Sequence, residues 1–148
     1  MNDARLEREF PVSPERLYAA VTNPADLSRW WGPEGMTLGD HTLDFTRLGP
    51  WHSVKIADQG RTMKMSGQVT SINPPNSVGF TWAWHDEEGN RGHESQVRIE
   101  LETVGEATRF TMTHSGLVDA ESRDSHERGW ISTLVKLEKL LPLEETAI

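Results

Sequence analysis

Apolar and polar residues alternate along most of the chain between residues 36 and 115, with the period of two that is typical of β-strands. Turn residues (glycine, proline, asparagine and aspartate) divide this region. The pattern predicts strands over the following stretches: Met36–Phe45, Trp51–Ile56, Met63–Ile72, Ser77–Trp84, Gln96–Glu102 and Thr108–His114. A weaker alternation over residues 5–10 predicts a first strand. Strict alternation favours an antiparallel sheet with one face in water and the other against a core.

The segment Asp119–Leu141 instead has the period of an amphipathic helix. Its apolar stripe consists of Trp130, Leu134, Leu137 and Leu141, flanked by Ile131 and Leu140. In the first turns the same arc carries Arg123, His126 and Glu127, and either Asp119 or Ser122 can cap the helix. Such a helix would cover the dry face of the sheet. Its polar first turns either close one end of a cavity or extend past the sheet into water.

Two short helices are predicted between the first strand and the rest of the sheet. Ser13 followed by Pro14 is typical of a helix start, and Asn23 before Pro24 ends this helix and can cap a second one that reaches Trp30. No repeat or linker interrupts the chain, so residues 1–148 are expected to form a single α+β domain.

Alternation also predicts which side chains face the gap between the sheet and the last helix. We expect a ligand-binding set formed by Trp82, Trp84, Met112, His114, Arg123, His126 and Trp130. Met63 and Met65 share the parity of Val69 and join this set, unless a bulge at Gly67 changes the register. Trp31, in the turn after the second short helix, is expected at the rim.

Composition narrows the possible functions. The net charge of −8 argues against nucleic acid as a partner, because phosphates require clustered lysine and arginine. There is no cysteine, no apolar run long enough for a membrane span and no signal peptide, so we expect a cytoplasmic protein. Six tryptophans accompany a single tyrosine, and several large rings in one region are suited to an apolar ligand site.

The six histidines do not have the spacing of metal ligands, and no phosphate-binding motif is present, so neither a metal nor a cofactor is expected. If the protein catalyses a reaction, His114 and Glu127 are the candidates for acid–base chemistry. The alternative is that His114 bonds a backbone group at the end of its strand and that the charged side chains form surface ion pairs.

Several segments, taken in order, resemble one known group of proteins. The turn Trp30–Gly35 is similar to a W-W-x-P-x-G motif, and Gly67–Pro75 with Phe80-Thr81-Trp82 is similar to G-x-V-x-x-I-x-P-P followed by F-x-W. Thr111–Leu117 resembles the last strand, and Gly129-Trp130 the final helix, of the same group. This group is the SRPBCC (START/polyketide cyclase-like) superfamily, and within it the homologues of the heat-shock protein 90 ATPase activator. The resemblance extends from about Ala4 to about Leu141.

This resemblance implies a helix-grip fold, in which a curved antiparallel sheet and two short helices accompany a long C-terminal helix over a pocket. One departure is the sequence Gly49-Pro50-Trp51, where many relatives have a Gly-Gly pair, so the geometry of that turn is open.

Three functions are compatible with these observations. The first is binding of a small apolar molecule without a cofactor. The second is a protein-interaction module that acts on a chaperone in the stress response, and the third is an enzyme of the cyclase or hydrolase type. A homodimer through an exposed sheet edge is also possible.

Overall fold

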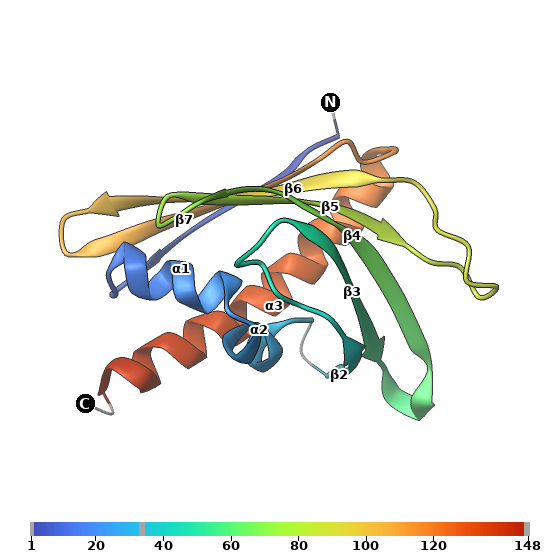
Figure 1. Cartoon of the computed structure of the whole chain (residues 1–148), viewed down its shortest axis with the longest axis horizontal. Coiled ribbons are helices and arrows are strands. Elements are labelled where there is room, and N and C mark those ends of the chain that lie inside the picture. The colour runs from blue at the N-terminus through green and yellow to red at the C-terminus, as the bar shows by residue number, and fades with distance from the viewer. Residues whose placement is uncertain (1, 33–34, 147–148) are drawn as a thin grey trace.

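The computed structural model describes residues 2–32 and 35–146 and shows an α+β fold (Figure 1). Within these residues the elements follow in this order: β1 (Ala4–Phe10), α1 (Pro14–Thr22), α2 (Pro24–Trp30), β2 (Thr37–His41), β3 (Gly49–Ile56), the short 3-10 helix η1 (Asp58–Gly60), β4 (Thr62–Asn73), β5 (Ser77–Trp84), β6 (Ser95–Val104), β7 (Ala107–Ser115) and α3 (Ala120–Thr146). Pro33 and Glu34 of the W-W-x-P-x-G motif lie outside the described residues.

The strands form one antiparallel sheet, as the alternating pattern predicts. Their order in the sheet is β1-β7-β6-β5-β4-β3-β2. Figure 1 shows that the sheet is curved and that α1, α2 and α3 all lie on its concave side. From the sequence, only the last helix was predicted to cover this face of the sheet. That assignment is incomplete, because α1 and α2 bury Leu17, Val21, Leu27 and Trp30 on the same side.

The helix starts are those that the sequence predicts. Ser13 caps α1 by accepting a hydrogen bond from the Arg16 amide, and Asn23 caps α2 by accepting one from the Ala25 amide. Of the two candidates for α3, Asp119 is the cap, since its carboxylate accepts the Ser122 amide at 2.7 Å.

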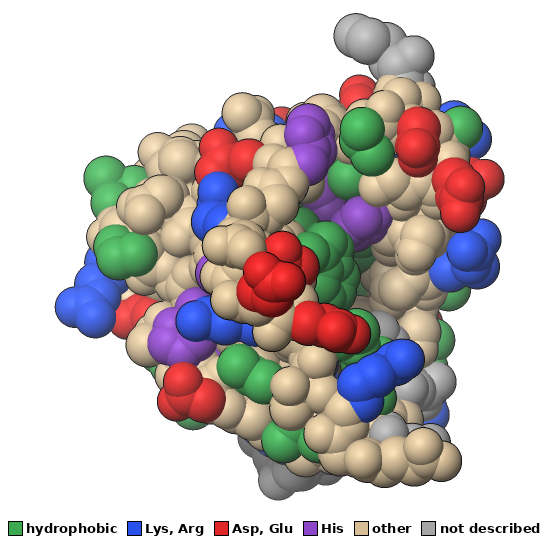
Figure 2. Space-filling view, turned by 90° about the vertical axis from the view of Figure 1, so that its right-hand side faces the viewer, with side chains coloured by type: hydrophobic (Ala, Val, Ile, Leu, Met, Phe, Trp, Pro, Cys, Tyr) green, Lys and Arg blue, Asp and Glu red, His purple; other side chains and the backbone are tan. Residues whose placement is uncertain are grey.

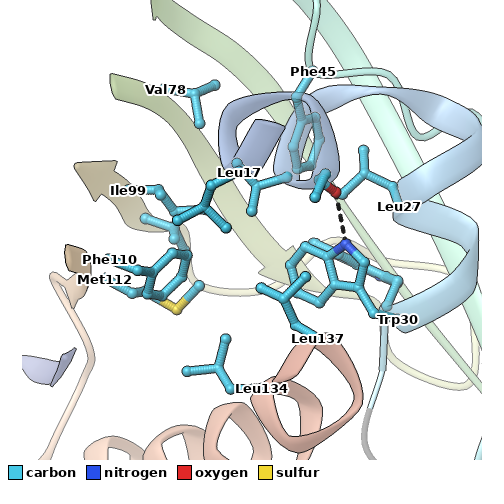
Figure 3. Close-up of a cluster of buried hydrophobic side chains, with 14 of the residues drawn as sticks. Leu17, Leu27, Trp30, Phe45, Val78, Ile99, Phe110, Met112, Leu134 and Leu137 are labelled. Atoms are coloured by element: carbon cyan, nitrogen blue, oxygen red, sulfur yellow. Dashed lines mark hydrogen bonds between the residues drawn. The ribbon is translucent and has the colours of Figure 1, made fainter. Parts of the chain in front are cut away.

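The core lies between the helices and the concave face (Figure 3). Leu134 and Leu137 of α3 point toward Met112 and Phe110 on β7, and the Trp30 indole N–H donates to the Ala20 carbonyl oxygen at 2.8 Å. The predicted stripe of α3 is buried, whereas Ile131, expected beside it, is 40% exposed. Ile131 and Leu140 lie on opposite flanks of the stripe, and only the flank of Leu140, which is 8% exposed, faces the core.

Two strand predictions need correction. The stretch Met36–Phe45 forms a strand only over Thr37–His41, because the chain then leaves β3 and the Phe45 amide bonds the Thr22 carbonyl oxygen at the end of α1. Strand β5 has no wet face, because Gly79, Thr81 and Ala83 on its outer side are buried as well. The turn predicted at Gly49-Pro50 is wrong, because both residues begin β3 and pair with Val69 and Gln68 of β4. Gly49 has a φ of 128° there, and Pro50 is exposed.

The pairing of β4 with β5 contains a register shift, and the close approach of the two strands before that shift depends on Gly67. The register shifts between Val69 and Ser71, so the bulge lies beyond Gly67 and leaves Met63, Met65 and Val69 with the same parity. At Gly67 the Trp51 indole N–H from the next strand donates to the Thr81 carbonyl oxygen at 3.2 Å. A Cβ atom on Gly67 would lie only 1.9 Å from that oxygen, so a side chain there would clash with the β5 backbone.

Candidate functional site

A cavity of about 150 Å³ lies under the first half of α3, between this helix and strands β3, β4 and β5. Its wall is formed by Trp31, Gly32, Met36, Lys55, Met63, Trp82, Trp84, Ser125, His126, Gly129, Trp130 and Thr133. Met36 and Met63 are half-buried and Ser125 is exposed, so these three lie toward the mouth. Figure 2, which views the side of the molecule where α3 begins, shows hydrophobic side chains in a hollow bordered by histidine and acidic side chains.

The elements position these side chains by simple periodicity. Trp82 and Trp84 share the inner face of β5, and Lys55 shares the inner face of β3 with Trp51 and Ser53. The α3 residues of the wall recur every three or four positions and therefore lie on one side of that helix. Gly129 leaves space in the wall, since a Cβ atom there would meet no other atom within 4 Å.

Most of the interior next to the cavity is filled by indole rings, which form one connected cluster of all six tryptophans. Trp82 packs against Trp130 with a ring-centroid distance of 5.2 Å and against Trp84 at 5.6 Å. Trp31, expected at the rim, is only 3% exposed and lies at the centre of this cluster, with its N–H donating to Ser53 Oγ. Trp31 points inward because it directly follows α2 and is the C-cap residue of that helix.

Two hydrogen bonds fix the tautomer of the His126 ring. Its Nε2 accepts the Trp84 indole N–H at 2.9 Å, which requires the proton to be on Nδ1, and Nδ1 donates to the Ser122 carbonyl oxygen at 2.7 Å. Burial lowers the pKa of His126, because the charged form loses its hydration. With both ring nitrogens engaged, His126 orients Trp84 and leaves no lone pair for proton transfer.

His114 lies outside the cavity wall and has a similar orienting role. Its Nδ1 accepts the Trp130 indole N–H at 3.0 Å, so its Nε2 carries the proton and donates to Ser95 Oγ at 2.7 Å. Ser95 in turn donates to the Trp82 carbonyl oxygen. Burial is the main cause that lowers the pKa of His114 to about 3, and the nearby His126 is the second cause. His114 is therefore neutral and fully hydrogen-bonded, but its partners are the side chains of Trp130 and Ser95 and not the backbone group that the structural alternative expected.

Of the ten predicted ligand-binding residues, the wall contains Trp31, Met63, Trp82, Trp84, His126 and Trp130. Met65, Met112 and His114 point inward as their parity predicts, but they are completely buried behind the wall. Arg123 lies outside the cavity as well, since its guanidinium bonds the Asp124 carboxylate at the surface. Glu127, the other acid–base candidate, is half-buried but does not line the cavity either.

The most informative residue that the sequence analysis missed is Lys55. Its side chain is 7% exposed, and its ammonium lies over the rings of Trp82 and Trp84 at 5.4 and 5.3 Å from their centroids. Burial and the neighbouring Lys136 lower the pKa of Lys55 to about 8. The signal in the sequence is that Lys55 shares the parity of Trp51. Gly32, Met36, Ser125, Gly129 and Thr133 were also missed, because small and mouth residues carry no periodic signature.

The described part of the chain contains no group of three or more histidine, aspartate and glutamate side chains that could hold a metal ion. Within the same part, no helix is long and apolar enough to cross a membrane.

A curved antiparallel sheet that holds a long C-terminal helix over a small apolar cavity defines a protein of the helix-grip, START-like class. The sequence agrees with this class, since residues 11–142 match the model of the family described as activator of Hsp90 ATPase homolog 1-like protein. The chain therefore belongs to this family, as the motifs at Trp30, Gly67 and Gly129 indicate.

Solved structures agree with the family and the fold. An activator of Hsp90 ATPase homologue from Silicibacter pomeroyi is 51% identical, with a TM-score of 0.93 over 96% of this chain and 99% of that one. Proteins from Chromobacterium violaceum (23% identity, TM-score 0.84, 95% and 98% coverage) and Nitrosomonas europaea (24%, 0.79, 97% and 96%) share the fold. No protein of curated function matches the chain significantly.

Proposed function

We propose that this protein binds a small apolar molecule in the cavity between its sheet and α3, without a cofactor. The observation that supports this proposal is the cavity itself, whose wall contains the indole rings of Trp31, Trp82, Trp84 and Trp130. An engineered cavity of about 150 Å³ in an unrelated protein takes up benzene. We therefore expect this cavity to accept one aromatic ring, with any larger substituent directed through the mouth near Met36 and Met63.

The test uses ethylbenzene as a probe and thermal unfolding as the measurement. A ligand that binds only the folded state raises its stability by RT ln(1 + [L]/Kd), about 1.4 kcal/mol at ten times Kd. For a domain of this size, such a gain corresponds to a rise of about 3–5 °C in the melting temperature. An unchanged melting temperature at saturating ethylbenzene contradicts the proposal.

A cavity-filling variant shows where the probe binds. Gly129→Leu places a side chain into the open space of the wall, so we expect it to fold and to lose the response to ethylbenzene. Arg128→Leu adds the same side chain at the exposed neighbouring position and should retain the full response. A response that persists in Gly129→Leu would show that ethylbenzene binds elsewhere.

Membership of the family also supports a second candidate, a module that acts on a chaperone. Its test is the ATPase rate of a bacterial Hsp90 with and without this protein at saturation, and an unchanged rate excludes this function. Cytoplasmic location, participation in a stress response, homodimer formation and a cyclase- or hydrolase-type activity stay predictions.

A further inference from the structure

Lys55 gives the cavity a chemical selectivity that its apolar wall alone would not have. The lysine stem lies against Gly32, since a Cβ atom on Gly32 would be 3.5 Å from Lys55 Cε. The ammonium at its end is on the cavity wall and over the faces of two indole rings. A strongly buried charge is normally paired with an opposite charge, because removing it from water is costly.

The protein supplies no such partner among the residues that the structure describes. The Lys55 ammonium makes neither a hydrogen bond nor an ion pair there, and no carboxylate influences its pKa. The indole faces attract the ammonium but accept none of its three N–H groups in conventional hydrogen bonds. These N–H groups are therefore available to a molecule in the cavity.

Two other polar side chains face Lys55 from α3, and neither of them is an anion. Lys136 on α3 directs its Nζ to the carbonyl oxygens of Trp31 and Gly32, at 3.4 and 3.1 Å, and it lowers the pKa of Lys55 by repulsion. His126 faces Lys55 from the same helix but is neutral, and its two ring nitrogens are engaged with Trp84 and Ser122. A negatively charged group would relieve this repulsion.

We propose that the ligand of this cavity is a small aromatic anion, such as an aryl carboxylate or a phenolate. Its ring packs among the indoles of Trp82, Trp84 and Trp130, and its anionic oxygen accepts a hydrogen bond from the Lys55 ammonium. This inference rests on the proposed binding function and adds the charge of the ligand to it.

Three probes with the same carbon skeleton test the charge separately from the apolar fit: phenylacetate, phenylacetamide and ethylbenzene. Titration calorimetry at pH 7 should show phenylacetate binding about tenfold to a hundredfold more tightly than phenylacetamide, the range expected of one charge-assisted hydrogen bond. Binding of ethylbenzene with no preference for the anion overturns this inference and leaves the proposed function intact. If none of the three binds, both are overturned.

Substitutions assign the preference to Lys55. Lys55→Met should bring the Kd values of phenylacetate and phenylacetamide to within about twofold of each other, because the charge that distinguishes the two probes is removed. Lys55→Arg keeps the charge and should retain part of the preference for phenylacetate. This variant is the control that separates loss of the charge from a folding defect caused by substitution at this position. Lys64→Met removes an exposed lysine from the adjacent strand and should bind like the original protein. A preference that survives Lys55→Met overturns the inference.

The pH dependence gives an independent readout. Loss of the Lys55 proton between pH 7 and pH 10 should weaken phenylacetate binding by about tenfold or more, whereas ethylbenzene binding should change little. His126 stays neutral over this range because its pKa is lowered, so the pH dependence should disappear in Lys55→Met. An affinity for phenylacetate that does not change up to pH 10 contradicts the ion pair.

Discussion

The buried position of the Lys55 ammonium is unfavourable for a positive charge when no ligand is bound, although two indole faces attract it. The pKa of Lys55 falls from 10.5 to about 8 because burial opposes the charged form, and Lys136 adds repulsion. The folded protein therefore releases this proton at a lower pH than the unfolded chain does. Between about pH 8 and pH 10.5 the unfolded state binds more protons, so the free energy of unfolding rises with pH in this interval.

At pH 7 we expect Lys55→Met to raise the free energy of unfolding by about 1–3 kcal/mol, because methionine fills similar space without a buried charge. Urea unfolding at pH 7 and pH 10.5 measures this effect, and the gain should shrink at the higher pH. Lys64→Met should change stability by less than about 0.5 kcal/mol. A Lys55→Met protein that is less stable at pH 7 would contradict this account.

The same residue shows the limit of what alternation predicts about the site. Trp82, Trp84 and His126 could be placed on the wall because apolar parity and helical spacing both point them inward. Lys55 shares the inward parity of Trp51, but a lysine in a strand is expected in water, and its apolar neighbours Val54 and Ile56 suggest the opposite face. Met65 and Met112 have the right parity, but no one-dimensional pattern separates a cavity wall from the core behind it.

At the scale of secondary-structure elements, the contact between β3, β4 and β5 depends on Gly67, which has no side chain. The Trp51 indole reaches the Thr81 carbonyl oxygen across β4 because Gly67 leaves room for it. This bond fixes Trp51 beside Trp82 at a centroid distance of 5.7 Å and so supports the wall of the cavity from behind.

Gly67→Ala should lower the free energy of unfolding by about 2–4 kcal/mol, since its Cβ would lie 1.9 Å from a backbone oxygen that cannot move without disturbing β5. Gly129→Ala is the matched control. Its Cβ meets nothing, and alanine favours the helix, so it should raise the free energy of unfolding by up to about 1 kcal/mol. Equal effects of the two substitutions in chemical denaturation would refute this assignment.

Element boundaries were predictable where the signal is local. Ser13, Asn23 and Asp119 cap their helices through hydrogen bonds with neighbouring amides, and cap residues carry this information in the sequence. The early end of β2 was not predictable, because it depends on a hydrogen bond between the Phe45 amide and Thr22, more than twenty residues away along the chain.

At the scale of the whole molecule, the two buried histidines link folding to pH. His114 and His126 are neutral in the folded protein because burial lowers the pKa of each below 6.5. The unfolded chain takes up these protons below about pH 6.5, so stability is fully present above that pH and is lost as the pH falls toward 3. The loss amounts to at most about 1.4 kcal/mol per pH unit for each histidine.

His114→Gln isolates this effect, because glutamine can accept from Trp130 and donate to Ser95 without titrating. We expect the variant to be less stable than the original protein at pH 7.5, by about 1–3 kcal/mol, because the buried site was shaped for an imidazole ring. The difference should narrow as the pH falls from 6.5 to 4. Urea unfolding at several pH values measures both curves, and curves that stay parallel would show that His114 does not carry the acid sensitivity.

The architecture as a whole could be predicted from the sequence, because periodicity gives the strands along the chain and the family motifs give the helix-grip arrangement. The size of the cavity could not, since it depends on how far the indoles of Trp31 and Trp130 fill the space between layers. That residues 1–148 form one domain stays a prediction.

The connected tryptophans also have an optical consequence. The ring centroids of consecutive members of the series Trp30, Trp31, Trp82 and Trp84 lie 5.6–6.0 Å apart. Trp51 and Trp130 pack beside this series at similar centroid distances. At such separations the transition dipoles of the indoles couple, so light absorbed by one ring becomes a shared excitation. The near-ultraviolet circular dichroism is then a property of the whole array. A guest molecule that turns Trp84 by a few degrees would alter this spectrum, and the protein would report its own occupancy without an added dye.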